Sequence, residues 1–232
     1  MSFGVIIAAA GSGSRMGGVY KPLERLNGRE MLLYSLDVFE KNDQTAFVVI
    51  SAREDKINEI SALCKEYNYV KVKSIVAGGK TRQESVENAF NCGLFDDTDI
   101  TYVAVHDAAR PLITDGIIEK VFCEAEQFEN AVCASKVRDT VKRTDELSVI
   151  TESVERENLW LIQTPQVFTK ENFTIAVNQA KKNGKVATDE STLLQSLGKK
   201  VKLCETPSYN IKITYPEDVF LAESIIKNRE GK

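Results

Sequence analysis

Apolar residues along the chain come in short uninterrupted runs, and amphipathic stretches lie between them. The first run, residues 4–9, has no polar interruption, as expected of a strand buried on both faces of a parallel sheet. In residues 115–128, by contrast, the apolar positions recur at helical spacing. Repeated units of this kind predict an α/β fold with a mostly parallel sheet and helices on both faces. The expected strands are residues 4–9, 46–51, 70–76, 101–106, 131–136 and 201–205, and later helices are expected at 170–182, 189–197 and 216–227.

This alternation of strands and helices breaks after residue 136. Residues 137–160 are rich in charge and threonine, and they contain two short alternating pieces at 140–143 and 149–154. A segment of this composition cannot bury much apolar surface by itself, so we interpret it as a β-arm that leaves the main sheet. Since we find no internal repeat, low-complexity tract or linker, residues 1–232 are predicted to form one domain that includes this arm.

Composition narrows the function classes. The net charge of −4 gives no reason to expect nucleic acid as a partner, so any anion site has to be a local cluster of Lys and Arg. No apolar run reaches the roughly 18–20 residues of a membrane span, so no membrane association is expected. The five cysteines are scattered and form no CxxC pair, which disfavours a zinc site or a disulfide framework and fits a cytoplasmic location.

A glycine-rich loop, AAAGSGSRM at residues 8–16, directly follows the first predicted strand. Small residues let the backbone approach a ligand closely, so that successive N–H groups can point at phosphate oxygens. The third glycine of a dinucleotide fingerprint is replaced by Met16, and a Walker motif is absent. Arg15 and Lys21 add two cations that suit a triphosphate and its transition state. From spacing alone, a plain strand–turn connection with surface cations stays open.

A second motif, VHDAARP at residues 105–111, lies at the carboxyl end of a predicted strand, where open parallel sheets bind ligands. Asp107 could hold a ribose hydroxyl or Mg²⁺ there, and Arg110 could hold a phosphate; the alternative is an Asp–Arg pair that fastens a turn. His106 is the only histidine. Because the nucleophile-elbow motif GxSxG is absent, we interpret it as a packed residue at the strand end rather than as part of a hydrolase triad.

Two further segments contain candidate ligand contacts. GGKTRQES, residues 78–85, is typical of a turn followed by a helix start, whose backbone groups and Ser85 hydroxyl could contact the edge of a base. A helix cap would explain Thr81 but leaves the double glycine unexplained. Lys212 lies in NIKIT, residues 210–214, an alternating piece predicted to be strand-like, where a lone lysine is usually solvated.

Four segments together resemble the 2-C-methyl-D-erythritol 4-phosphate cytidylyltransferases, a family of the non-mevalonate isoprenoid pathway: AAAGSGSRM, VAVHDAARP, VRDTVKR with LIQTPQVF, and NIKITYPED. They occur nearly from end to end, in the family's order and with similar spacing. The resemblance implies a Rossmann-like nucleotidyltransferase fold, a homodimer joined by the 137–160 arms, and Mg²⁺ carried with CTP. It also implies transfer of CMP from CTP to 2-C-methyl-D-erythritol 4-phosphate, which gives 4-diphosphocytidyl-2-C-methyl-D-erythritol and pyrophosphate.

The resemblance implies roles for individual residues as well. Arg15 and Lys21 match the pair that stabilises the transition state, and Arg156 and Lys212 match the pair that positions the sugar phosphate. The implied nucleotide contacts are Ala8, Ala9, Ala10, Gly11, Gly13, Gly79, Ser85 and Asp107, and the implied substrate contacts are Asp107, Arg110, Thr140, Arg156, Thr164 and Lys212. No side-chain metal ligand is implied beyond Asp107 as a candidate.

Two positions depart from the family pattern, and two other functions compete. Lys21 is followed by proline where glutamine is more common, and Lys80 stands where an acidic residue is common. The nearest alternative is a cytidylyltransferase for another polyol phosphate such as ribitol 5-phosphate, which the VRDTVKR and HDAARP segments disfavour. The other is a regulatory nucleotide-binding module without catalysis; such a protein should lack one of the four cationic residues, and all four are present.

Overall fold

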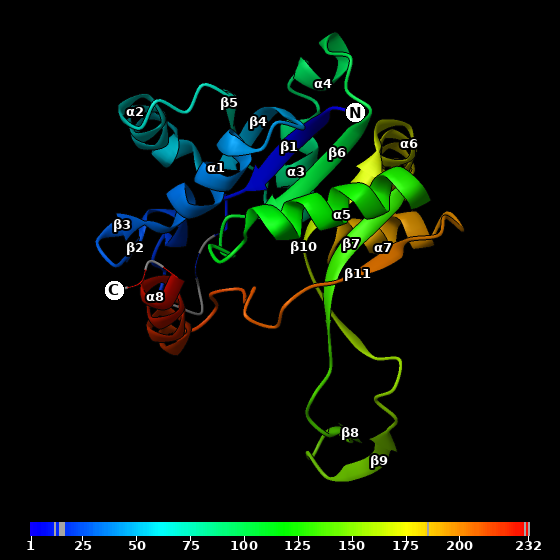
Figure 1. The fold of residues 1–232 in the computed structure, drawn as a ribbon. Helices are drawn as coiled ribbons and strands as arrows, with labels where there is room; N and C mark the ends of the chain where they lie inside the picture. The colour runs from blue at the N-terminus through cyan, green and yellow to red at the C-terminus, as the bar shows by residue number, and fades with distance from the viewer. Residues whose placement is uncertain (12, 14–16, 185, 230, 232) are drawn as a thin grey trace.

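A seven-stranded sheet lies at the centre of the molecule (Figure 1). The computed structural model describes residues 1–11, 13, 17–184, 186–229 and 231. In order across the sheet, the strands are β11 (Lys202–Glu205), β7 (Asn130–Lys136), β10 (Trp160–Thr169), β6 (Tyr102–Asp107), β1 (Phe3–Ala8), β4 (Thr45–Ala52) and β5 (Val72–Ala77). β10 pairs antiparallel with β6 and β7, and the other pairings are parallel. The predicted mostly parallel sheet is therefore confirmed.

β1 illustrates how the apolar pattern produces the central layer. Side chains alternate between the two faces of a strand, so Phe3, Val5 and Ile7 pack into one hydrophobic cluster and Ile6 packs into another. All four side chains are fully buried. Burial of each contributes on the order of 1.5–3 kcal/mol, which is why an uninterrupted apolar run marks a strand covered on both faces.

Helices cover both faces of the sheet, as predicted. The helices on one face are α1 (Met31–Lys41), α2 (Ile57–Glu66) and α5 (Asp115–Phe128). Those on the other are α3 (Arg82–Phe90), α4 (Leu94–Asp97), α6 (Lys170–Asn183) and α7 (Glu190–Gln195). A third cluster packs α8 (Pro216–Arg229) against the two-stranded ribbon of β2 (Arg25–Leu26) and β3 (Arg29–Glu30). Among the described residues, no helix is both long and apolar enough to cross a bilayer.

The apolar pattern does not predict β10. Gln163, Thr164 and Gln166 interrupt its apolar residues, and its pairing with β7 shifts register between Ile162 and Gln166. These polar side chains are buried and take part in hydrogen bonds; for example, Asn210 Nδ2 donates to Gln163 Oε1 (3.1 Å) and to Thr164 O (3.0 Å). A buried strand whose polar groups find partners elsewhere in the fold has no distinctive pattern in the sequence.

The predicted arm contains a hairpin of β8 (Val141–Thr144) and β9 (Ile150–Val154), which pair antiparallel with each other in a separate sheet. Figure 1 shows this hairpin extending away from the body, beyond the ends of β7 and β10. Large apolar side chains are exposed on it, among them Leu147 at 84% and Ile150 at 62%. A two-stranded hairpin is marginally stable by itself in water, so covering this surface would stabilise it.

The strand predicted at residues 210–214 is wrong, because this segment has no strand pairing. Single hydrogen bonds hold it instead: the Ile213 N–H donates to Ala109 O (2.8 Å), and the Thr214 N–H donates to Asp218 Oδ2 at the start of α8 (2.7 Å). The alternating pattern reflects burial of Ile213 in the cluster under α8, while Lys212 faces the cavities described below.

Candidate active site

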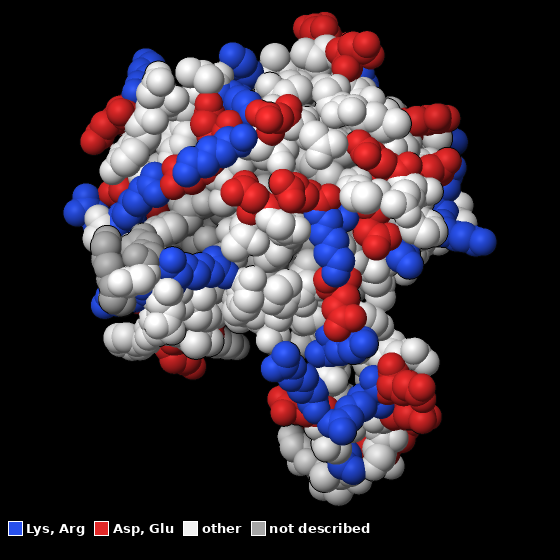
Figure 2. All heavy atoms as spheres, viewed as in Figure 1, with Lys and Arg blue, Asp and Glu red and all other residues white. Residues whose placement is uncertain are grey.

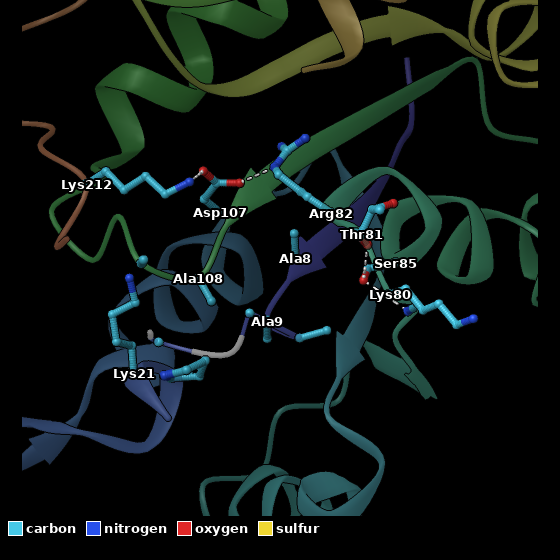
Figure 3. A pocket seen from close by; sticks show the side chains of 16 residues that line it. Ala8, Ala9, Lys21, Lys80, Thr81, Arg82, Ser85, Asp107, Ala108 and Lys212 are labelled. Atoms are coloured by element: carbon cyan, nitrogen blue, oxygen red, sulfur yellow. Dashed lines mark hydrogen bonds and ion pairs between the residues drawn. The ribbon is translucent and has the colours of Figure 1, made fainter. Parts of the chain in front are cut away.

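A cavity of about 450 Å³ opens at the carboxyl ends of β1 and β6 (Figure 3). Parallel neighbours place these ends at one edge of the sheet, so the loop after β1 meets Asp107, the last residue of β6. The turn after β5 forms the opposite wall. The predicted nucleotide and catalytic residues that line this cavity are Ala8, Ala9, Ala10, Gly11, Gly13, Lys21, Gly79, Ser85, Asp107 and Lys212.

The loop after β1 is anchored through its backbone. The Ala9 N–H donates to Ser51 O (2.8 Å), which ties the start of the loop to β4. Gly13 has φ +65°, and a Cβ there would lie 1.8 Å from the carbonyl oxygen of Val19, so this position requires glycine. The predicted catalytic residue Arg15 lies outside the described residues.

Close packing explains the double glycine of the turn after β5. A Cβ on Gly78 would lie 2.2 Å from the Cβ of Ala10, and a Cβ on Gly79 would lie 2.2 Å from the Cβ of Glu84. Side chains at either position would therefore push the turn away from its neighbours. The glycines let two loops from separate strands approach and share one cavity.

Hydrogen bonds inside the same turn engage two of its backbone N–H groups. Ser85 Oγ accepts from the Gly79 N–H (3.0 Å) and donates to Thr81 O (2.8 Å). Thr81 caps α3 by accepting from the Glu84 N–H (3.1 Å), and Glu84 in turn accepts from the Lys80 N–H (2.6 Å). The Gly79 and Lys80 N–H groups are therefore satisfied within the turn, whereas Lys80, Thr81 and Arg82 line the cavity.

Asp107 connects two cations across the cavity, as the dashed lines in Figure 3 show. Its Oδ1 accepts from Arg82 Nε (2.9 Å) and its Oδ2 accepts from Lys212 Nζ (2.6 Å). Burial alone would raise the pKa of Asp107, but the charges of Arg82 and Lys212 outweigh burial and hold that pKa well below its ordinary range. Asp107 is therefore an anion at every physiological pH, and its charge fixes both cations.

Lys21 lies opposite the turn that contains Gly79. It is the first residue of the short 3-10 helix η2 (Lys21–Leu23), and its Nζ donates to Ile213 O (3.1 Å). Figure 3 shows Lys21 and Lys212 on one side of the cavity, with Lys80, Thr81 and Ser85 on the other. Two ammonium groups thus approach the cavity from the same side.

A second cavity, of about 680 Å³, adjoins the first and contains the predicted residues Arg110 and Thr164. The two linings have three residues in common: Arg82, Asp107 and Lys212. Arg110 is almost fully buried and donates to the carbonyl oxygens of Asn210 (2.7 Å) and Ile162 (3.3 Å). Its Nε is fully buried and has no hydrogen-bond partner among the described residues.

The structure does not bring Arg156 and Thr140 to either cavity. Both are exposed and belong to the arm segment. Arg156 lines a depression at the base of the arm together with Lys136 and Arg138, and its Nη1 donates to the carbonyl oxygen of Arg138. Figure 2 shows lysine and arginine side chains, interspersed with carboxylates, over this part of the molecule. In a single chain these two residues therefore lie apart from the other predicted site residues.

His106 is fully buried beneath the site, and its hydrogen bonds define one tautomer. Its Nε2 lies 3.2 Å from Arg110 O, a pure acceptor, so Nε2 bears the proton. Its Nδ1 lies 3.1 Å from Thr164 Oγ1, which itself accepts from the Asp107 N–H (3.0 Å), so the threonine hydroxyl donates to Nδ1. Burial lowers the pKa of His106 to about 4 and keeps the ring neutral. The expected packing role is consistent with this network.

Comparison with known proteins decides the family. The family model for 2-C-methyl-D-erythritol 4-phosphate cytidylyltransferase (IspD) matches residues 3–228. The chain belongs to this family. It is 39% identical to the 2-C-methyl-D-erythritol 4-phosphate cytidylyltransferase of Shouchella clausii (strain KSM-K16), over 100% of both chains. It is 38% identical to that of Clostridium botulinum (strain 657 / Type Ba4), over 96% of each.

Solved structures of the same family share the fold. The cytidylyltransferase from Thermus thermophilus is similar with a TM-score of 0.80 and 29% identity, covering 98% of this chain and 100% of that one. The 4-diphosphocytidyl-2C-methyl-D-erythritol synthase from Anaerococcus prevotii DSM 20548 is similar with a TM-score of 0.82 and 26% identity, covering 97% and 98%. The expected Rossmann-like nucleotidyltransferase fold is therefore confirmed.

Sequence analysis of this cytidylyltransferase family member missed Arg82, which lines both cavities, and its ion-pair partner Glu190. Arg82 Nη1 donates to Glu190 Oε1 (2.6 Å), although the two are 108 positions apart. Arg82 lies within the GGKTRQES motif, so its place in the first cavity could have been inferred from the motif. Glu190 directly follows a helix-capping aspartate, and no pattern in the sequence links it to Arg82.

Among the described residues, the first cavity of this family member offers a metal ion few side-chain ligands. Asp107 is the one carboxylate that lines the first cavity in the described part of the chain, and Arg82 and Lys212 already engage both of its oxygens. No group of three or more His, Cys, Asp or Glu side chains is placed for a metal among the described residues. Mg²⁺ commonly binds through substrate phosphates with few protein ligands, so the paired state of Asp107 disfavours it as a direct ligand.

The burial of His106 makes a prediction about stability in this cytidylyltransferase. Its pKa is about 4 in the fold and 6.5 in the unfolded chain, so between these values the unfolded chain binds the extra proton. The free energy of unfolding should then rise with pH through this window, by up to about 1.4 kcal/mol per pH unit. Above the window His106 is neutral in both states, and its contribution to the free energy of unfolding is fully present. Urea denaturation of the wild type and of His106→Gln at pH 4.5 to 7 measures the difference in slope. Parallel pH curves for the two proteins would contradict the assignment.

Proposed function

We propose that the chain transfers CMP from CTP to 2-C-methyl-D-erythritol 4-phosphate and releases pyrophosphate. The observation that carries this proposal is the pair of adjoining cavities whose common wall is Arg82, Asp107 and Lys212. A nucleotidyl transfer needs two anionic substrates to meet at one phosphorus, and two cavities that meet at a cationic wall suit that requirement. The names of the family relatives supply the substrates.

The first cavity is the proposed nucleotide site. The small residues 8–11 after β1 allow the backbone to approach the triphosphate. The turn formed by residues 78–85 would contact the base, and its carbonyl oxygens would serve as acceptors. Acceptors match the exocyclic amino group of cytosine, whereas uracil presents a carbonyl oxygen at that position. This turn therefore supports CTP as the nucleotide.

The nucleophile is proposed to be the phosphate of the polyol phosphate. A phosphate monoester has a second pKa of about 6, so it is mostly dianionic at neutral pH and needs no general base. The obstacle is repulsion between this dianion and the triphosphate. Lys21 and, as proposed from the family, Arg15 would stabilise charge on the triphosphate, while Lys212 on the common wall would hold the attacking phosphate in line. Mg²⁺ bound to the triphosphate would supply further neutralisation of its charge.

The active unit is proposed to be a homodimer in which each arm completes the partner's site. The exposed apolar side chains of the 137–160 arm support an interface there, since a hairpin of this kind gains stability when it is covered. Arg156 and Thr140 lie apart from both cavities of their own chain, which supports contacts to a neighbouring site. Arg156 would grip the sugar phosphate with its planar guanidinium.

The organisation and location of the protein are proposals as well. Residues 1–232 are proposed to act as one domain, because one sheet joins segments from residue 3 to residue 205. All five cysteines are free, which supports a reducing, cytoplasmic environment. The alternative of a ribitol 5-phosphate enzyme is not favoured, since the relatives are named 2-C-methyl-D-erythritol 4-phosphate cytidylyltransferases.

Pyrophosphate release is the direct test of this function. With Mg²⁺ present, CTP and 2-C-methyl-D-erythritol 4-phosphate are expected to give steady turnover, with a kcat/KM at least about tenfold above that for ribitol 5-phosphate, because one well-matched polar contact is worth roughly that factor. UTP, ATP and GTP are expected to be poor substitutes for CTP. Faster turnover with ribitol 5-phosphate would transfer the assignment to the other polyol phosphate, and comparable turnover with purine nucleotides would reject the proposed base contact.

A further inference from the structure

Four charged side chains form a continuous row of alternating sign between the two cavities. Lys212 Nζ lies 2.6 Å from Asp107 Oδ2, Arg82 Nε lies 2.9 Å from Asp107 Oδ1, and Arg82 Nη1 lies 2.6 Å from Glu190 Oε1. The first three residues of the row line both cavities, whereas Glu190 lines neither. Glu190 is therefore connected to both cavities through Arg82.

Glu190 is the most buried member of the row. Its side chain is 4% exposed, and its Oε2 has no hydrogen-bond partner among the described residues. A buried carboxylate is costly unless a cation pairs with it, and removal of one partner from such a pair is strongly destabilising. Arg82 is the ion-pair partner that the structure gives Glu190. This dependence fixes the Arg82 guanidinium at Glu190, since moving away would leave a buried charge unpaired.

The backbone of α7 holds Glu190 firmly against the sheet. Asp189 caps the helix by accepting from the Thr192 N–H (3.1 Å). Gln166 of β10 donates to Asp189 Oδ2 (2.9 Å) and accepts from the Ser191 N–H (3.0 Å), so it binds the residues on both sides of Glu190. The carboxylate that anchors Arg82 is thus itself fixed to the central sheet.

We propose that Glu190 is a positioning residue that acts through Arg82 to keep Asp107 and Lys212 in place on the common wall. A guanidinium is planar, and its N–H groups point in fixed directions. With Nη1 held by Glu190, Arg82 meets one oxygen of Asp107 and leaves the other oxygen to Lys212. Without Glu190, the guanidinium is free to take both oxygens of Asp107 in a bidentate pair, and it then competes with Lys212 for Oδ2 and loosens Lys212 from the wall.

The kinetic test rests on the proposed function and uses Glu190→Gln, which removes the charge and keeps the shape. The KM for the polyol phosphate is expected to rise more than that for CTP, with kcat/KM for the polyol phosphate falling roughly 10–100-fold, the scale of a small displacement at a reacting group. Arg82→Gln should cause a similar loss, and the double variant should lose no more than the larger single variant. Losses that multiply in the double variant, or an unchanged ratio of the two KM values, would overturn the proposal.

A matched control and a second variant complete the kinetic test. Glu59→Gln removes the same charge from an exposed ion pair with Lys56 (2.8 Å) on α2, and it should leave kcat/KM unchanged. If Glu190→Gln does not fold, Arg82→Lys serves instead, because a single ammonium cannot span Asp107 and Glu190 as the guanidinium does. Arg82→Lys should give the same shift in the ratio of the KM values.

A crystal structure of the folded variant supplies a readout that needs no activity. In Glu190→Gln, Arg82 is expected to turn from α7 toward Asp107, and the 2.6 Å contact between Asp107 and Lys212 is expected to be lost. Persistence of that contact would reject the positioning role, whatever the enzyme's activity. Loss of the contact in a protein whose wild type does not turn over CTP would instead reject the proposed function alone.

Discussion

Replacement of Lys21 by alanine is expected to lower kcat by roughly 10²–10³-fold, the scale observed when one preorganised donor to a transition state is removed. Lys21 lines the first cavity, and its Nζ donates to the Ile213 carbonyl oxygen, so the ammonium is held at the cavity before the nucleotide arrives. Charge that develops on the triphosphate therefore meets a cation that needs little rearrangement. Arg15 is proposed to share this role, so Arg15→Ala should cause a loss of kcat of similar size.

The measurement is kcat under saturating CTP and polyol phosphate, with thermal unfolding of each purified variant as a check on folding. Lys41→Ala is the matched control, because Lys41 is an exposed lysine at the end of α1 that lines neither cavity. It should retain wild-type kcat. A folded Lys21→Ala protein with kcat close to that of Lys41→Ala would show that Lys21 does not act on the transition state.

At low polyol phosphate, a mixed dimer of Lys21→Ala and Arg156→Ala subunits is expected to regain activity that both parent homodimers have largely lost. If each arm serves its neighbour, one site combines both lesions and the other has an intact Lys21 and an intact Arg156. The Arg156→Ala homodimer should show a KM for the polyol phosphate raised roughly 10–100-fold, since a charge-assisted hydrogen bond is worth roughly 1.5–3 kcal/mol. Its KM for CTP should change far less.

The outcome separates action in trans from action in cis. If Arg156 serves its own chain, every site of the mixed dimer carries one lesion and activity stays at the single-variant level. Mass measurement has to show that the mixed dimer forms, and mixing of wild-type subunits with Lys21→Ala subunits provides the reference for one working site. Activity at the single-variant level in a verified mixed dimer rejects the shared site.

Fold prediction succeeded where one local property determined the structure. β1 and the first four residues of β6 are uninterrupted apolar runs because both of their faces are covered, and this requirement is visible in the residues themselves. β10 escaped prediction because Gln163, Thr164 and Gln166 are buried through hydrogen bonds to residues far away in the chain. The strand predicted at residues 210–214 failed for the converse reason, since alternation arose from burial under α8 without any strand pairing.

Site residues, too, could be predicted where a local rule places them and could not be predicted where a contact between distant segments does. Asp107 and the residues after β1 were found because the carboxyl ends of parallel strands form binding sites, a rule that needs only the strand assignment. The contact between Arg82 and Glu190 joins α3 to α7, and a single sequence contains no signal for such a pairing. The roles of Arg156 and Thr140 came from family resemblance alone, and a single chain places neither residue at a cavity.

The position of β10 in the sheet also constrains how the protein is made. β7 pairs with β10 and β11, which follow it in the chain, and it does not pair with any of the strands synthesised before it. During translation residues 130–136 therefore leave the ribosome as an apolar strand without an edge to join, and the 137–160 arm has to emerge before residues 160–169 can fill the gap beside β6. Pairings that close so late are entropically costly and slow. The nascent chain thus exposes an unpaired strand for the time taken to synthesise the arm.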